Sequence, residues 1–210
     1  MSEAKLEMMD QPGAEEVIAA TRIWLERAVI GLNLCPFAKT VHLNNRIRYF
    51  VSDARSPARL LKDLMAELRS LDATDAAQCE TTLLIHPYVL ADFLDYNAFL
   101  EQADDAVSEL GLEGVIQLAS FHPRYQFEDA GPDEIGNYTN RSPYPMLHLL
   151  RESSVERAVT TYPDTTVIYR KNIETLRRLG HDGWRRLWLV EAPQEATMRL
   201  GPKKSAASEQ

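Results

Sequence analysis

The sequence predicts an α/β protein with a small, mostly parallel sheet of three to four strands and helices packed on it. Short apolar patterns at 46–53, 81–87 and 114–123 are typical of strands, and long patterns with helical spacing at 54–71 and 90–112 separate them. Helices between successive strands of one sheet imply right-handed parallel crossovers. A ferredoxin-like α+β sheet is the alternative, if the chain holds a strand that these patterns do not reveal.

A first helix is predicted from Glu15 to Leu34. Glu15 and Glu16 place carboxylates at the positive end of the helix dipole, and Pro36 ends the pattern. Apolar residues recur at helical spacing between these limits: Val17, Ala20, Ile23, Trp24, Ala28, Val29 and Leu32. Because such a stripe needs a partner surface, we expect Trp24 to be largely buried.

The next elements have clear boundaries. In 46–53, Ile47, Tyr49 and Val51 alternate on one face, as in a strand that lies at a sheet edge. Ser56 is a favourable N-cap for the helix in 54–71, with proline at the following position. Gly111 closes the helix in 90–112.

The chain after the third strand is less regular. Residues 124–145 form a long polar segment, and loops of this length are usually functional or disordered. Their aromatic residues favour an ordered loop. Three helical segments are predicted after it, at 146–162, 164–180 and 181–189, with Gly180 ending the second.

Composition indicates one cytoplasmic domain at 14–191, a flexible arm at 1–13 and a flexible tail at 192–210. The chain has 210 residues, a net charge of −8 and two cysteines outside any CxxC pair. A nucleic-acid partner is not expected, because such binding requires clustered Lys and Arg. No stretch reaches the roughly 18 to 20 apolar residues of a membrane span, and the acidic N-terminus is no signal peptide. No oligomeric state is predicted.

Two predicted strands end in the same dipeptide, His86-Pro87 and His122-Pro123. In open α/β sheets, ligands bind outside the carboxyl ends of the strands. If the second and third strands are neighbours, both histidines open onto one crevice. Arg124 and Gln126 follow His122 directly, which favours a functional role for His122, whereas His86 alone is read as a strand terminator.

A second polar group precedes the helix predicted from residue 146. It contains Asn137, Asn140, Arg141 and Ser142, and His148 falls on the first turns of that helix. A helix N-terminus attracts anions, and Arg141 adds a bidentate fork for carboxylate or phosphate. The ordinary alternative is an N-cap with Arg141 in a surface ion pair.

Cys35 lies in "GLNLCPFA", at the predicted end of the first helix. Core filling is the favoured interpretation, because the C-terminal end of a helix does not stabilise a thiolate. A nucleophile activated by His122 or an arginine is the alternative. Cys79 lies in a polar loop and is expected to have no role.

Three stretches, "GLNLCPFA", "SFHPRYQF" and "NYTNRSPYPMLHLLRESSVERA", together resemble the bacterial family catalogued as domain of unknown function 1415. The resemblance extends from the first helix to "RRLWL". It implies a bacterial, soluble protein of about one domain. It supplies no activity and no catalytic residues to carry over.

Three functions remain open from the residues. The first is an enzyme of hydrolysis or group transfer on a small anionic molecule, held by Arg124 and Arg141. There His122 is the acid or base, Cys35 the nucleophile, and Asn137 and Asn140 orient the substrate. The second is a metal site of His86 and His122 with His148 or Cys35. The third is a ligand-binding domain without chemistry. No cofactor is predicted, since neither GxxxxGK[ST] nor GxGxxG occurs.

Overall fold

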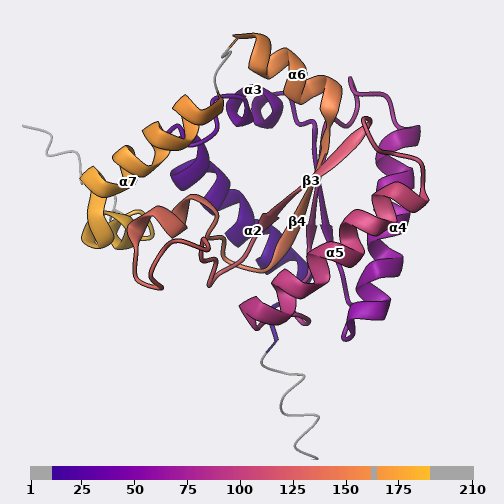
Figure 1. Cartoon of the computed structure of the whole chain (residues 1–210), viewed down its shortest axis with the longest axis horizontal. Helices are drawn as coiled ribbons and strands as arrows, with labels where there is room; N and C mark the ends of the chain where they lie inside the picture. Colours follow the sequence, from indigo (N-terminus) through magenta and orange to yellow (C-terminus); the bar gives the residue numbers. More distant parts are fainter. Residues whose placement is uncertain (1–10, 162–164, 190–210) are drawn as a thin grey trace, which may run out of the picture.

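The computed structural model of the protein describes residues 11–161 and 165–189. Most of the expected arm at 1–13 and all of the expected tail at 192–210 lie outside these ranges. Figure 1 shows a central sheet seen nearly edge-on, with α4 and α5 on one side and α2 and α7 on the other. Within the described ranges, no helix combines the length and apolarity that a membrane crossing requires.

The sheet has four strands in the order β1-β2-β4-β3: β1 (Ile47–Val51), β2 (Thr81–Ile85), β4 (Met146–Arg151) and β3 (Ile116–Phe121). β1 pairs with β2 in parallel at the sheet edge, whereas β4 is antiparallel to both of its neighbours. The α/β class is confirmed, but the sheet is mixed rather than mostly parallel. Its element order also differs from the β-α-β-β-α-β order of a ferredoxin-like sheet.

The strand β4 was predicted as the start of a helix, and that prediction is wrong. Only α6 (Glu152–Thr161) is helical in this part of the chain. In β4, Leu147 and Leu149 pack on one face of the sheet and Met146 on the other. A strand buried on both faces has no period-2 alternation, so a short apolar run of this kind does not differ from a helical one by pattern.

The predicted helices on the α4 side are confirmed. α4 (Pro57–Ala73) follows Ser56, whose Oγ accepts the Arg59 amide proton at 3.4 Å. α5 (Phe93–Glu109) is capped by Asp92, which accepts from two backbone N–H groups. Leu60, Leu64, Tyr96 and Phe99 of these helices bury one face of the sheet.

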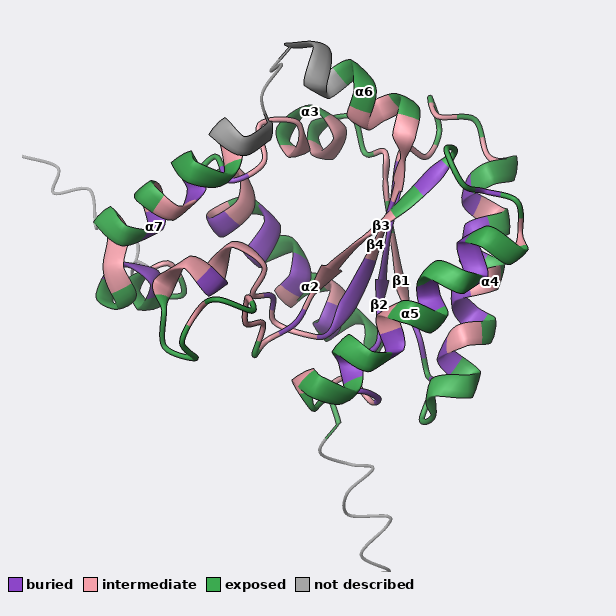
Figure 2. Ribbon diagram, viewed as in Figure 1, coloured by how far each residue is buried: buried purple, intermediate pink, exposed green. Residues whose placement is uncertain are grey.

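The opposite face is covered by α2 (Ala14–Trp24) with its π-helical continuation η1 (Leu25–Ile30), and by α7 (Thr165–Arg186). Val17, Trp24, Leu176 and Trp184 pack there against residues of β2 and β4. Trp24 is 4% exposed, which confirms the predicted burial. Figure 2 shows buried residues on the inner sides of the helices and along the strands.

Gly180 interrupts α7, at the boundary predicted between two helical segments. Its φ of 65° and ψ of 173° are not helical, and glycine adopts positive φ without the steric cost of a side chain. α7 packs on the 3₁₀ turn η2 (Ile135–Thr139), which lies within the long loop. A short helix, α3 (Ala38–Leu43), connects η1 to β1.

Candidate functional site

His86 and His122 both lie at the carboxyl end of the sheet, but their strands are not neighbours, because β4 runs between β2 and β3. Tyr96 fills the space between the two rings, with centroid distances of 5.7 Å to His86 and 5.1 Å to His122. The Tyr96 hydroxyl donates to Met146 O at 2.9 Å and accepts from Phe121 N at 3.1 Å. The predicted open crevice is therefore occupied by a buried aromatic cluster.

Both ring nitrogens of His122 are bonded to backbone. Nδ1 accepts the Arg124 amide proton at 3.0 Å, so Nε2 carries the ring proton and donates it to Leu90 O at 3.2 Å. Burial lowers the pKa of His122, and the nearby Arg124 charge lowers it further. His122 is thus a neutral, fixed ring, and its partner Leu90 has a left-handed φ of 57°.

His86 and Arg124 bond to the carbonyls on either side of Leu90. His86 Nδ1 donates to Val89 O at 3.1 Å, and Arg124 Nη2 donates to Ala91 O at 2.7 Å and to Asp92 at 3.2 Å. Burial lowers the pKa of His86 to about 4. Three side chains therefore hold three consecutive carbonyls of the loop that leads into α5.

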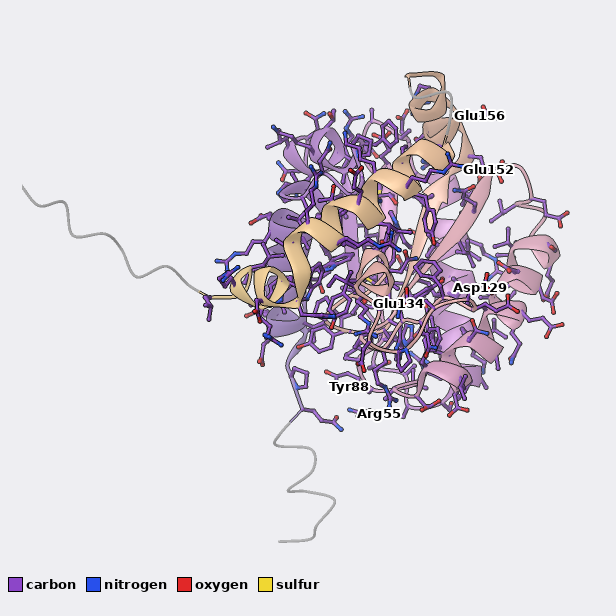
Figure 3. All side chains as sticks on the ribbon, turned by 60° about the vertical axis from the view of Figure 1, so that its left-hand side comes forward. Arg55, Tyr88, Asp129, Glu134, Glu152 and Glu156 are labelled. Atoms are coloured by element: carbon purple, nitrogen blue, oxygen red, sulfur yellow. The ribbon has the colours of Figure 1, made fainter. Side chains whose placement is uncertain are left out.

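The same loop is bonded to the first described residues of the chain. Tyr88 donates its hydroxyl proton to Pro12 O at 2.6 Å, and the Arg55 guanidinium carbon lies 4.1 Å from the Tyr88 ring centroid. Arg55 also bonds Gln11. Figure 3 labels Arg55 and Tyr88 side by side, next to the start of the described chain.

The two asparagines of the long loop also bond to backbone. Asn137 is buried; its Oδ1 accepts from Phe127 N at 3.0 Å and its Nδ2 donates to Gly131 O at 2.8 Å. Asn140 Nδ2 donates to Ser120 O at 3.1 Å, at the end of β3. These bonds order the loop, as its aromatic residues had indicated, and tie both side chains to the backbone of the fold.

Gln126 and Ser142 have similar partners. Gln126 Nε2 donates to Ala130 O at 2.7 Å, and the Ser142 hydroxyl donates to Tyr144 O at 2.7 Å. Both side chains therefore close local turns in the loop.

The helix N-terminus that was expected to bind an anion is not formed, because β4 starts at Met146. His148 lies in the middle of that strand, with Nε2 2.7 Å from the Thr81 hydroxyl. That hydroxyl donates its proton to Leu149 O at 2.6 Å, so it accepts the proton of His148 Nε2. Burial of its ring nitrogens lowers the pKa of His148 to about 4, so the ring is neutral at pH 7.

The predicted nucleophile and metal ligands do not converge. Cys35 is partly buried beyond η1, and among the described contacts none joins it to His122. The described residues contain no group of three or more His, Cys, Asp or Glu side chains placed to hold a metal ion. Cys79 lines a separate hollow of about 170 Å³ beside Arg48 and Thr74.

Arg141 is a predicted site residue that lines a pocket on the surface of the protein. Its Nε donates to Tyr125 O at 3.2 Å and its Nη2 to Pro132 O at 2.7 Å. Its guanidinium carbon lies 4.3 Å from the centroid of the Tyr138 ring. These contacts fix the plane of the guanidinium. Its remaining terminal nitrogen, Nη1, bonds none of the described residues.

Arg141 forms one wall of a pocket of about 380 Å³ between α2, the segment 138–143 and the end of α7. We call it the tryptophan pocket, because it is lined by all three tryptophans of the chain together with Ala20, Ile23, Pro123, Tyr138, Arg141, Ser142 and Pro143. Of the three tryptophans, Trp24 and Trp184 are buried, and Trp188 is 37% exposed.

Aromatic contacts set the shape of this pocket. Trp24 Nε1 donates to Arg141 O at 2.9 Å, which ties α2 to the loop. Trp184 meets Tyr138 and Trp188 edge to face, at centroid distances of 5.0 and 5.4 Å. Tyr138, Trp184 and Trp188 are not among the site residues that the motifs predict. The one signal in the sequence is that two of its three tryptophans lie in the final predicted helical segment.

A family model described as "Protein of unknown function (DUF1415)" matches residues 16–186. The tryptophan pocket is built largely within this range, and two of its walls come from the stretches "SFHPRYQF" and "NYTNRSPYP". Comparison of the chain with curated proteins and with solved structures finds no match.

Proposed function

The chain belongs to the DUF1415 family, and we propose that it is a binding protein for a small anionic molecule, which occupies the tryptophan pocket. The observation that carries this proposal is the presence of one fixed guanidinium, that of Arg141, in the wall of an aromatic hollow. The alternatives of catalysis at His122 and of a metal at His86 and His122 have less support.

The shape and lining of the pocket support a small ligand. Small-molecule sites are concave, mainly apolar, and range from roughly 300 to 1,000 Å³. The tryptophan pocket, at about 380 Å³, falls at the small end of this range. Its aromatic walls supply buried contact area, and its few polar groups are of the kind that orient a ligand.

Arg141 supports an anionic ligand. Two of its five N–H groups are committed to carbonyls, which hold the side chain in place before a ligand arrives. Both protons on Nη1 remain without a described partner. A guanidinium fixed in this way loses little conformational entropy when it binds a carboxylate or phosphate, so its charge-assisted bonds contribute more to affinity.

The contacts of His122 favour binding over catalysis. A general base needs a nitrogen that reaches the substrate proton, and both nitrogens of His122 are bonded to backbone. Its burial and its lowered pKa fit a structural ring in the same way. We therefore assign to His122 and Arg124 the role of holding the loop before α5, and to Arg141 the role of binding the ligand.

The test is calorimetric titration of the protein with benzoate, a small anion that fits the pocket. We expect Arg141→Gln to weaken binding at least tenfold, because it removes the charge and the free donors. Arg141→Lys, which keeps the charge, should lose less. Arg124→Gln is the matched control, since Arg124 is an exposed arginine on the neighbouring segment and does not line the pocket.

Arg141 also stabilises the long loop, through its bonds to Tyr125 O and Pro132 O. Thermal melting of each variant therefore separates a binding defect from unfolding. Equal affinity in wild type and in a folded Arg141→Gln protein would refute the proposal. So would the absence of any benzoate binding to wild type, tested up to millimolar concentration.

A further inference from the structure

We infer that the natural ligand is an aromatic monocarboxylate, with a flat ring seated among the aromatic side chains of the tryptophan pocket and a single negative charge facing Arg141. This inference rests on the proposed function and adds the chemical class of the ligand. Three features of the pocket carry it: the mutual orientation of the rings, the exposure at the mouth, and the charges around Arg141.

The rings form a corner with perpendicular walls. The Trp184 plane makes angles of 76° with Tyr138 and 73° with Trp188. Aromatic rings attract one another in offset-stacked and edge-to-face arrangements, because the ring faces are negative and the ring edges positive. A flat ring placed in this corner stacks on one wall while it meets the next wall edge to face. A bulky aliphatic group of equal volume gains only the burial.

The mouth of the pocket exposes apolar surface that a ring would cover. Trp188 is 37% exposed and Ile23 is 42% exposed, and both line the pocket. Scattered exposed apolar residues are normal on protein surfaces. Here Ile23 comes from α2 and Trp188 from the chain beyond α7, and both line the same pocket. A ring bound between them removes both surfaces from water.

Surrounding charge favours a monoanion. Arg141 Nη2 bonds Pro132 O, which precedes two exposed acidic residues, Asp133 and Glu134. Asp129 lies on the same loop, and Figure 3 labels Asp129 and Glu134 on it. A dianion is repelled by these carboxylates and by the net charge of −8. A carboxylate with one charge matches the single free edge of one guanidinium.

The experiment compares four probes by calorimetric titration. They are benzoate, cyclohexanecarboxylate (the same charge without an aromatic ring), benzyl alcohol (the ring without the charge) and phenyl phosphate (the ring with two charges). We expect benzoate to bind tightest, with cyclohexanecarboxylate about three- to tenfold weaker, as the strength of aromatic pairs implies. Because all three tryptophans line the pocket, benzoate should also change their fluorescence emission.

Two variants at one position test the contribution of the ring. Trp188→Leu keeps apolar bulk at the mouth and should reduce the preference for benzoate over cyclohexanecarboxylate, because one of the aromatic walls is lost. Trp188→Phe keeps a flat ring and should retain that preference. Trp188 is partly exposed, so both variants should fold, and thermal melting checks this.

The outcomes separate this inference from the proposed function. If cyclohexanecarboxylate equals benzoate while Arg141→Gln weakens both, the ring assignment is wrong and the anion proposal stands. If phenyl phosphate binds tighter than benzoate, the monoanion assignment is wrong. If no anion binds, the proposed function itself fails. Tryptophan emission that changes with protein concentration, without any probe, would show a second copy covering the mouth and would overturn the inference.

Discussion

At the scale of single residues, the polar groups after β3 shape the backbone around them. The sequence indicated that His122 and Arg124 stand where a strand ends, and this is correct. Their partners are carbonyls of Leu90 and Ala91, more than thirty positions earlier in the chain. No local pattern reveals a hydrogen bond across that separation, so the residues could be predicted as unusual but not their partners.

These hydrogen bonds predict that His122→Phe and Arg124→Ala lower the free energy of unfolding by different amounts. The phenylalanine keeps a ring but leaves the buried Leu90 carbonyl and the Arg124 N–H without partners, so the free energy of unfolding should fall by about 1 to 3 kcal/mol. Arg124 is exposed, and water replaces its bonds when it is removed. Urea unfolding measures both values. An equal or larger loss for Arg124→Ala would contradict the structural role of His122.

At the scale of elements, helices and strands could be predicted where the sequence carries local signals such as caps and apolar stripes. α4 and α5 carry caps and an apolar stripe, and they form as expected. β4 has neither cap nor alternation, because β2 and β3 flank it and helices cover both its faces. Its strand conformation is set by pairing with residues distant in the chain. Because a helix was predicted at this position, an anion site was also predicted at a helix N-terminus that does not exist.

The first helix carries the clearest energetic prediction at this scale. Trp24 is 4% exposed, packs on Phe121 at a centroid distance of 5.4 Å, and bonds Arg141 O. Trp24→Ala should reduce the free energy of unfolding by about 3 to 5 kcal/mol, because it opens a large cavity in the core. Trp24→Phe, the control, keeps most of the packing and should cost less. A loss below 1 kcal/mol for the alanine variant would mean that α2 contributes little to the core.

At the scale of the whole molecule, the tryptophan pocket exists only after folding. Its walls come from Trp24, from the segment 138–143 and from Trp184 and Trp188, which are brought together by α2 and α7 on one face of the sheet. Composition and motifs identified Arg141 and Ser142 as candidates. The aromatic half of the site follows from tertiary packing, which the motifs do not encode.

Two histidines with lowered pKa values, His86 and His148, make the stability of the whole fold depend on pH. In the folded chain the pKa of His86 and of His148 is about 4, against an ordinary value of 6.5. Between these values the unfolded chain binds protons that the folded chain excludes. Stability is therefore greatest above about pH 6.5 and is lost as the pH falls toward 4. This window lies above the range in which most carboxylates titrate, so the histidines dominate it.

His148 allows this dependence to be measured on one group, since burial alone lowers its pKa. Urea unfolding at pH 7 and at pH 4.5 should show His148→Gln losing less stability between the two than wild type, by about 2 kcal/mol or less, as linkage for one such group implies. His181→Gln is the matched control, the same exchange at an exposed histidine. The glutamine variant is compared with itself at the two pH values, so a constant cost of the substitution cancels. An unchanged pH difference in His148→Gln would show that this ring does not titrate on unfolding. The acid sensitivity of the fold would then have to arise at His86 and His122, whose rings bond carbonyls of the loop before α5.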